Sequence, residues 1–456
     1  MGSRSKVTGN GISFSKYSTF QRVKFSDNGP AFQKSPHLDA RPAMIHLRVV
    51  FLSFITILFS VGIFQCPQTA NAETFFVSRQ GDDNNPGTKA LPWRTVSEST
   101  LRLSPGDRLL IQPGNYEDEG QIFVRFVDPE TFEFQPLEGS ESQTTRIEAA
   151  TDVAPRIFGN FDIRGSYIEV SGLKILGDST STAPGIGVFE SHHISVNNCK
   201  LAFHGGGGIN FNHSDVVRAT RNRCFFNGST NPDQHSGISS FQPIVRTNTD
   251  ERYGVVLNEN ICIGNFNEVP TSNGDVTDGN GIIIDDHYYT QFNGLIADVL
   301  AGTSDPQSST GNPTIGIGGD GNLLPYQRRS FVSRNLCVRN GGRGVHVFLS
   351  DDVMVVNNFC RANLKSQPLL DALPTDNNGN PFFVFGEINI GDSTRVRVVR
   401  NVAVATSTVS AAGAEQFFNL QGQVSTNRWF RNLLSNVSGG PKVSVANSDS
   451  SDLLDY

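Results

Sequence analysis

The sequence predicts an all-β solenoid, a single domain made of stacked coils of short strands. A polar motif, Asn-x-Cys, returns along the chain, and a small residue followed by a short β-rich stretch comes after most of its copies. No segment between these motifs has a clear helical periodicity. A unit made of a few short strands cannot bury an apolar side alone, so such units must stack on their neighbours.

The composition is that of a folded protein and excludes several classes. Of the 456 residues, 18% are charged and 37% are hydrophobic, with 45 Gly and 33 Phe. A coiled coil would be richer in Ala, Glu, Lys and Leu, and a disordered chain would be poorer in aromatic residues. The 37 basic residues are outnumbered by 44 acidic ones, which argues against a nucleic-acid binder of the usual basic kind.

The amino-terminal segment predicts export. Residues 1–48 carry eight Lys or Arg and two acids, an apolar run covers Val49 to Phe64, and Ala70-Asn71-Ala72 follows. This pattern predicts a signal peptide over 44–72, cleaved before Glu73, and a secreted, periplasmic or cell-surface protein. Met44 offers an alternative start, which would leave 1–43 as an untranslated basic leader. The rival interpretation is a retained membrane anchor, but the run is short for a span.

The exported part of the chain is acidic. Without residues 1–72 it has 29 basic and 42 acidic residues, a net charge of −13. A polyanionic ligand would therefore need bridging cations or a locally basic cleft.

The Asn-x-Cys motif sets the repeat. The shortest separations between its copies are 23 to 26 residues, and the longer ones indicate the same unit with inserted loops. We expect the Asn side chains to hydrogen-bond along a column and the Cys side chains to point inward. The copies are Asn197-Asn198-Cys199, Asn222-Arg223-Cys224, Asn260-Ile261-Cys262, Asn335-Leu336-Cys337 and Asn358-Phe359-Cys360.

These motifs resemble the coils of right-handed parallel β-helices of the pectate-lyase-like superfamily. The start of the exported chain adds to the resemblance, with Pro92-Trp93-Arg94-Thr95 and Pro113-Gly114-Asn115-Tyr116. The resemblance implies a β-helix over 73–440, closed at its first coil by a short capping helix at about Thr95–Leu103. We expect residues 441–456 to form a flexible tail, and the protein to be a monomer.

The five exported cysteines predict a stack of free thiols. Export favours disulfides, but five is an odd number and all five copies share one frame. Cysteines stacked on adjacent strands are also farther apart than disulfide geometry prefers.

The strand of the second motif carries the candidate chemistry. Aligning its copies gives one outward column of Asn210, Ser239, Ile283, His346 and Asn389. A second column contains Asn212, Phe241, Asp285 and Phe348, with Gln242 and Asp286 one residue further on. Loops inserted beside such a strand make a groove, which suits an extended polymer.

The densest cluster is Thr277-Asp278-Gly279-Asn280-Gly281, followed by the strand that ends in Asp285-Asp286. Clustered acids raise each other's pKa unless a cation neutralises them, and oxygen-only clusters suit Ca²⁺. We predict Asp278, Asp285 and Asp286 as metal ligands and Arg343 or His346 as the catalytic base. His235, Ser239, Gln242 and Asn280 are the predicted substrate-binding residues.

The resemblance implies the same arrangement, because pectate-lyase-like enzymes bind Ca²⁺ through Asp residues on adjacent coils and use Arg or Lys as the base. The match is one of residue type and place, without a full family signature. Asp278-Gly279-Asn280-Gly281 can also be a plain turn, and Arg343 can be a structural ion-pair partner.

The sequence therefore favours a Ca²⁺-assisted lyase or C5-epimerase that acts on an extracellular uronate polymer. Two alternatives stay open: an inverting glycosidase that uses two of the Asp residues, and a non-catalytic carbohydrate-binding β-helix.

Overall fold

The computed structural model describes residues 72–446, apart from 129–130, 132, 273, 292–313, 320–321, 372, 374, 376–380, 382 and 418–425. These residues belong to one compact unit, Gln68–Tyr456. The predicted signal peptide and basic leader lie outside the described residues.

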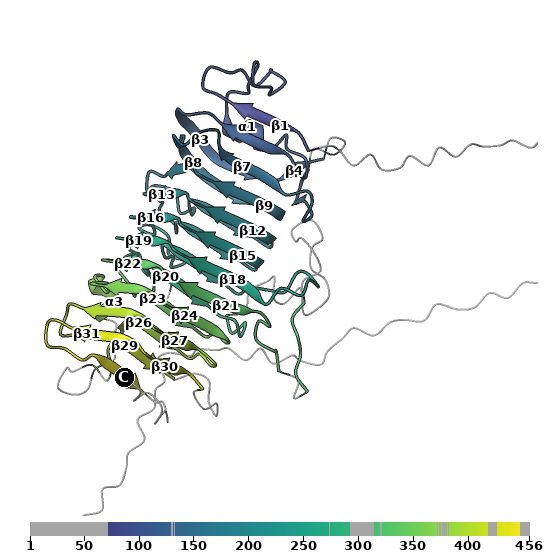
Figure 1. Cartoon of the computed structure of the whole chain (residues 1–456). Helices are drawn as coiled ribbons and strands as arrows, with labels where there is room; N and C mark the ends of the chain where they lie inside the picture. The colour runs from purple at the N-terminus through teal and green to yellow at the C-terminus, as the bar shows by residue number, and fades with distance from the viewer. Residues whose placement is uncertain are drawn as a thin grey trace, which may run out of the picture. The chain divides into compact units, whose positions relative to one another are not determined.

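The unit is a right-handed parallel β-helix, as predicted. Its coils are stacked from β1 (Thr74–Val77) to β32 (Val443–Ala446), and each complete coil adds one strand to each of three parallel ladders (Figure 1). A hairpin of β4 (Phe126–Val127) and β5 (Phe134–Gln135) is the antiparallel exception among the named strands.

The first ladder is the longest of the three. It contains β1, β2 (Arg108–Ile111), β7 (Thr145–Ala149), β9 (Gly165–Ser171), β12 (His192–Asn197), β15 (Asp215–Thr220), β18 (Tyr253–Asn258), β21 (Arg329–Ser333), β24 (Val353–Val356), β27 (Arg397–Val399) and β30 (Arg428–Phe430), with β6 (Leu137–Glu138) pairing beside β9.

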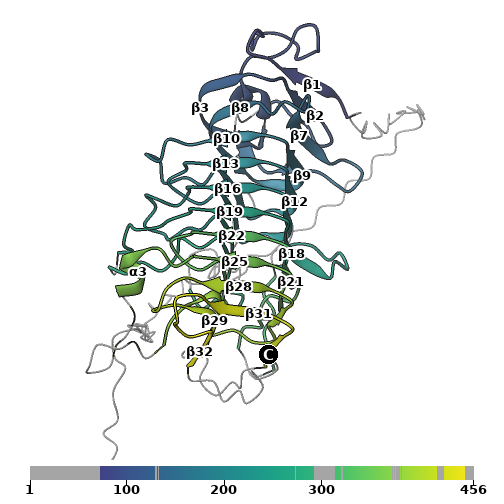
Figure 2. The same ribbon diagram turned by 60° about the vertical axis from the view of Figure 1, so that its left-hand side comes forward.

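The second ladder has the shortest strands, and Figure 2 shows them above one another. It contains β10 (Lys174–Leu176), β13 (Lys200–Ala202), β16 (Arg223–Phe225), β19 (Ile261–Ile263), β22 (Leu336–Val338), β25 (Phe359–Arg361), β28 (Val402–Ala405) and β31 (Leu433–Asn436).

The third ladder contains the strands of the second motif. It consists of β3 (Asn115–Val124), β11 (Ile186–Phe189), β14 (Ile209–Asn212), β17 (Ile238–Phe241), β20 (Ile282–Asp285), β23 (Val345–Phe348), β26 (Gly386–Gly391), β29 (Ala411–Gln416) and β32. The long strand β8 (Arg156–Ile163) pairs with β3, β10 and β11 and so joins the second and third ladders.

A single left-handed residue makes each corner of a typical coil, with φ between 43 and 66°. Asn198, Arg221 and Glu259 occupy the first corner, between the first and second ladders. Phe203, Phe226 and Arg339 occupy the second corner, between the second and third ladders. His213, Gln242 and Asp286 occupy the third corner, which leads back to the first ladder.

The predicted Asn column is present at the first corner. From Asn222 to Asn432, each Asn donates its backbone N–H and Nδ2 to Oδ1 of the Asn on the next coil, over distances of 2.8 to 3.1 Å. A second column of the same kind lies at the second corner. It consists of Asn227, Asn265, Asn340 and Asn363, and it ends on the carboxylate of Glu387.

The prediction that the cysteines are free, buried thiols is confirmed. The prediction that all five share one register is wrong for Cys199. All five described cysteines are free and buried. Cys224, Cys262, Cys337 and Cys360 stack as neighbours on the second ladder. Cys199 does not join them, because Leu201 pairs with Cys224, and the backbone N–H of Cys199 donates to Asn222 instead. Cys199 therefore stands at the head of the first Asn column, two residues away from the predicted frame.

The ends of the solenoid differ in detail from the sequence prediction. The helix α1 (Val96–Thr100) is shorter than the predicted capping helix, and its first N–H groups, of Val96 and Ser97, donate to the Glu119 carboxylate. A second short helix, α3 (Gln367–Asp371), follows β25. Strand β32 lies within 441–456, so the third ladder continues into the predicted tail.

Within the part of the chain that the structure describes, no helix is long and apolar enough to span a membrane.

Candidate functional site

The candidate site lies on the outer face of the third ladder. The register pairs Asn210 with Ser239, then Ile283, His346 and Asn389, which confirms the first predicted column. Asp285 pairs with Phe241 on one side and Phe348 on the other, which confirms the second column. The residues between these columns point the other way and fill the core, as the pleat of a strand requires.

His346 is a buried imidazole with a free nitrogen. The residue is 6% exposed, and its Nδ1 has no hydrogen-bond partner among the described residues. Its ring centroid lies 5.4 Å from that of Phe348. Burial, and then the charge of Arg343, hold its pKa well below the usual value. The imidazole is therefore neutral near pH 7 and can accept a proton.

Asp285 stands at the end of β20, half-buried between two phenylalanine positions. Its Oδ1 has no hydrogen-bond partner within the described part of the chain. Burial, followed by the charges of Asp278 and Asp286, raises the pKa of this carboxyl group well above its usual range. A raised pKa favours the protonated form of a carboxyl group, which can donate its proton.

Asp278 and Arg343 are both buried at the entrance to the third ladder, and each influences the other electrostatically. Burial raises the pKa of Asp278 to about 6, and the positive charge of Arg343 opposes the rise. The Arg343 guanidinium lies 3.8 Å from the ring centroid of Phe385 and donates to the carbonyl of Thr277. Burial lowers the pKa of Arg343 to about 10. Arg343 therefore remains a cation and is held as a positioning group, which disfavours it as a base.

Asp286 is turned away from Asp278 and Asp285. It is fully buried at a left-handed corner with φ of 54°, so the chain turns between Asp285 and Asp286. Its carboxylate accepts hydrogen bonds from Gln242 Nε2, from Thr290 N and Oγ1, and from Gln291 N, each 2.8 Å long. These contacts hold the loop that leaves the third corner.

The predicted substrate-binding residues fall into two groups. Gln242 and Asn280 are fully buried and hydrogen-bonded within the protein: Gln242 to Asp286 and the Gln291 carbonyl, and Asn280 to Ser236 and Asp278. Ser239 and His235 lie nearer the site surface. Ser239 Oγ has no partner among the residues described, and His235 Nδ1 contacts Asn210 Nδ2.

The three carboxylates do not form a cation site by themselves. No group of three or more His, Cys, Asp or Glu side chains within the described residues could hold a metal ion. The Asp286 oxygens accept four hydrogen bonds, and Asp278 Oδ1 accepts one from Asn280. Asp285 Oδ1 has no partner among the described residues, but one such oxygen falls short of the six to eight oxygen ligands that Ca²⁺ takes.

The sequence did not identify Phe385 or Glu387 as parts of this region. Phe385 lies against Arg343, and Glu387 ends the second Asn column. Glu387 opens a copy of the second motif, Glu387-Ile388-Asn389-Ile390, which places it on the following coil but does not indicate its role in the column. Phe385 belongs to no pattern that marks it in the sequence.

Comparison with known proteins adds little to this picture of the site. No family model matches the chain. It is 25% identical over 137 residues to the "Uncharacterized protein YwoF" of Bacillus subtilis (strain 168), a match that covers 28% of each chain.

Several solved structures resemble the chain in fold. Pectate lyase Pel9A has a TM-score of 0.42 at 12% identity, covering 83% of this chain and 78% of its own. An alginate lyase from Paenibacillus sp. str. FPU-7 has a TM-score of 0.33 at 12% identity, covering 82% and 97%. The complex of XylC with xylose has a TM-score of 0.45 at 8% identity, covering 80% and 76%. The functional interpretation therefore rests on the side chains of this chain.

Proposed function

We propose that the protein is a secreted enzyme that acts on a uronate-containing polysaccharide by β-elimination or C5-epimerisation, with His346 as the base. The observation that carries the proposal is the Nδ1 of His346, unpartnered among the described residues, on the outer face of the third ladder, one coil away from Asp285, a carboxyl group whose pKa is raised by burial. A neutral imidazole can act as the base that takes a proton from the carbon next to a carboxylate.

In this mechanism His346 Nδ1 takes the proton from the carbon next to the uronate carboxylate. The electron pair forms a carbon–carbon double bond as the adjacent carbon–oxygen bond breaks, and Asp285 gives its proton to the leaving oxygen. Arg343 supplies positive charge near the substrate carboxylate while Asp278 holds Arg343 in place. An epimerase would instead return a proton to the opposite face of the same carbon.

Hydrolysis is the second candidate, and the raised pKa values of two carboxyl groups that influence each other favour it. Burial raises the pKa of Asp285 well above its usual range and that of Asp278 to about 6, so Asp285 could serve as acid and Asp278 as base. This route needs both carboxyl groups and does not need His346.

The test is activity of the purified protein on pectic, alginate and neutral glycans, with Ca²⁺ and with a chelator. New ultraviolet absorbance from unsaturated uronate supports the lyase, and its loss in His346→Gln supports the assigned base. His193→Gln, which changes a half-buried histidine on the first ladder, is the matched control. Reducing ends without absorbance, lost in Asp278→Asn, would transfer the assignment to hydrolysis.

Three further outcomes bear on the ligand and the reactions that the sequence suggested. Inhibition by the chelator would show that Ca²⁺ takes part together with substrate oxygens, as the sequence predicts. Proton exchange without cleavage would indicate an epimerase, and silence in every readout would contradict the proposal in favour of a binding protein.

A further inference from the structure

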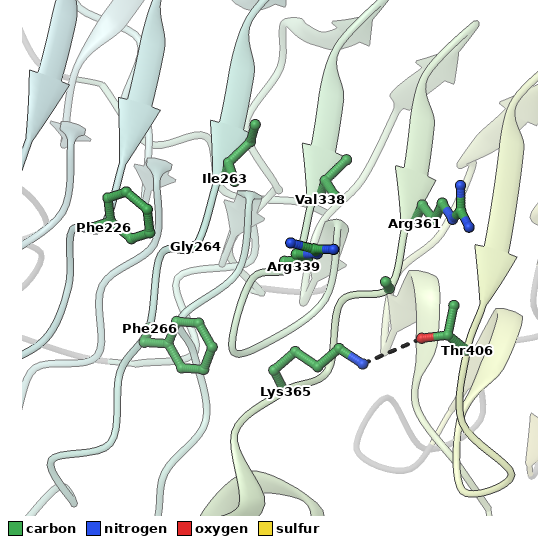
Figure 3. A pocket seen from close by; sticks show the side chains of 10 residues that line it. Phe226, Ile263, Gly264, Phe266, Val338, Arg339, Arg361, Lys365 and Thr406 are labelled. Atoms are coloured by element: carbon green, nitrogen blue, oxygen red, sulfur yellow. Dashed lines mark hydrogen bonds between the residues drawn. The ribbon is translucent and has the colours of Figure 1, made fainter.

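A groove of 860 Å³ lies along the second corner, where the second ladder ends and the chain turns toward the third ladder. Its lining includes Phe226, Phe266, Arg339, Arg361, Lys365 and Thr406. Figure 3 shows the two phenylalanines at one end of the groove and the basic side chains along the rest of it. None of these residues takes part in the chemistry proposed above.

The charge in the groove is opposite to that of the exported chain. Arg339, Arg361 and Lys365 are exposed, and no acidic residue lines the groove in the described part of the chain. None of the three has an ion-pair partner within the described residues. Three exposed cations thus lie together on a chain of net negative charge. Burial raises the pKa of Glu387, and the charge of Lys365 opposes this rise.

Backbone contacts fix the spacing of these cations. The Arg339 N–H donates to the Arg361 carbonyl over 3.2 Å, so the two arginines lie on adjacent coils, roughly 4.8 Å apart along the solenoid. Lys365 is anchored by its N–H to the Asn340 carbonyl, and its Nζ donates to Thr406 Oγ1 over 3.3 Å. The groove therefore presents positive charge at intervals set by the stacked coils.

An exposed aromatic pair continues the groove toward the amino-terminal coils. Phe226 is 54% exposed and stacks on Phe203, which is 49% exposed, with ring centroids 5.7 Å apart and an interplanar angle of 9°. On the next coil Gly264 lies against the Phe226 ring, where a Cβ would come within 2.7 Å of it. The glycine therefore leaves room for the ring to lie across the corner.

Together these features fit a polymer whose sugar rings carry carboxylates. Planar guanidinium groups bind carboxylates through paired hydrogen bonds, and flat aromatic faces pack against the apolar faces of sugar rings. A neutral glycan would gain nothing from the three cations, which favours a polymer with carboxylates over a neutral one.

We propose that this groove is a second binding site for acidic polysaccharide, which holds carboxylate-bearing sugars of the polymer away from His346. The identity of the polymer rests on the proposed function, whereas the presence of the groove and its charge do not.

The test compares two triple variants of the full chain in the His346→Gln background, so that the polymer is not consumed. One carries Arg339→Gln, Arg361→Gln and Lys365→Gln. The control carries Arg397→Gln, Arg400→Gln and Arg428→Gln, which removes the same charge from exposed positions of the first ladder and its corner. Affinity for polygalacturonate and alginate is measured by calorimetry, with a neutral β-glucan and duplex DNA as comparison ligands.

We expect the groove variant to bind the acidic polymer at least about 10-fold more weakly, with little change in the control. Equal affinities of the two variants, or no binding of acidic polymer by the parent protein, would overturn the proposal. So would equally tight binding of the β-glucan or of DNA. Phe226→Ala should weaken binding about threefold, and Phe359→Ala, another exposed phenylalanine of the second ladder, should not.

The two proposals can fail separately. If the protein shows no turnover but the groove variant loses polymer binding, the groove proposal is supported and the proposed enzymatic function is contradicted. If turnover requires His346 but the groove variant binds the polymer as tightly as the parent protein, the proposed function is supported and the groove proposal is contradicted.

Discussion

The outer faces of the second and third ladders differ in what covers them, although the same coils build both. On the third ladder His346 is 6% exposed and Asp278 is 8% exposed, and burial shifts both pKa values. On the second ladder Arg339 and Lys365 face solvent, and Phe226 is 54% exposed. Removal from water tunes acids and bases, whereas exposure leaves charges able to attract a polymer from solution.

The largest expected effect separates the two faces directly. His346→Gln should lower kcat by about 10² to 10⁴-fold, because it removes the base, and leave polymer affinity unchanged. The groove triple variant should raise KM and leave kcat unchanged. Steady-state kinetics on the polymer measure both, and a fall in kcat with the groove variant would contradict the division of roles.

The second Asn column joins the two faces, so breaking it should disturb both. Asn340→Ala removes the acceptor for two hydrogen bonds from Asn265 and two donors of its own side chain. We expect the free energy of unfolding to fall by about 3 kcal/mol, because buried polar groups lose their partners. Denaturant unfolding measures the loss, and Asn84→Ala, at an exposed position, is the control. A loss equal to that of the control would show that the column is dispensable.

The carboxyl group that ends this column gives a pH signature. Burial raises the pKa of Glu387 from its ordinary 4.5 to about 7. The folded state then binds this proton more tightly than the unfolded state, so the group stabilises the fold at low pH. Its contribution is lost as the pH rises from about 4.5 to 7, by at most about 3 kcal/mol.

Thermal unfolding at several pH values checks this, with Glu387→Gln as the comparison. The variant should lack this part of the slope even if it is less stable throughout. If stability depends on pH in the same way in the wild-type protein and in Glu387→Gln, Glu387 is already ionised in the folded state across this pH range.

Ionic strength should act on one face more than on the other. Raising the salt concentration from 0.05 to 0.5 M should weaken polymer affinity by roughly 10-fold, because the groove cations are exposed and screened. kcat should change little, since Asp278 and Arg343 are both buried. Parallel calorimetry and kinetics test this, and a salt-independent affinity would indicate that the aromatic pair dominates binding.

The smallest expected effect is a shift of the pH profile. The charge of Arg343 lowers the pKa of His346, so Arg343→Gln should raise it. Because the base acts when unprotonated, the acid limb of kcat/KM should move to higher pH, by up to about one unit. Arg339→Gln, on the other face, should not move it. A shift in the opposite direction would exclude His346 as the titrating base.

The sequence predicted the fold and the register of the third ladder, because a two-residue period fixes which side chains share a column. The pairing of His346 with Ile283 and Asn389 was predicted in this way and is confirmed. The Cys199 frame was wrong because Asn197-Asn198 places two asparagines near one corner, and the pattern does not say which residue makes the turn.

The second Asn column has a signal in the sequence, because Asn227, Asn265 and Asn340 each lie five residues after an Asn of the first column. Other features can be found only in three dimensions. The sequence contains no signal for the separation of Asp286 from Asp285, because this separation depends on a single left-handed residue. The packing of Phe385 on Arg343 likewise depends on how a distant segment returns to the solenoid.

The stacked cysteines allow the opening of the solenoid interior to be measured one coil at a time. Cys224, Cys262, Cys337 and Cys360 each belong to a different coil, and all four are fully buried. A thiol reagent in the medium can reach one of them only when its own coil opens. The order in which they react would therefore map the local breathing of the solenoid and show whether it loosens from one end or in the middle.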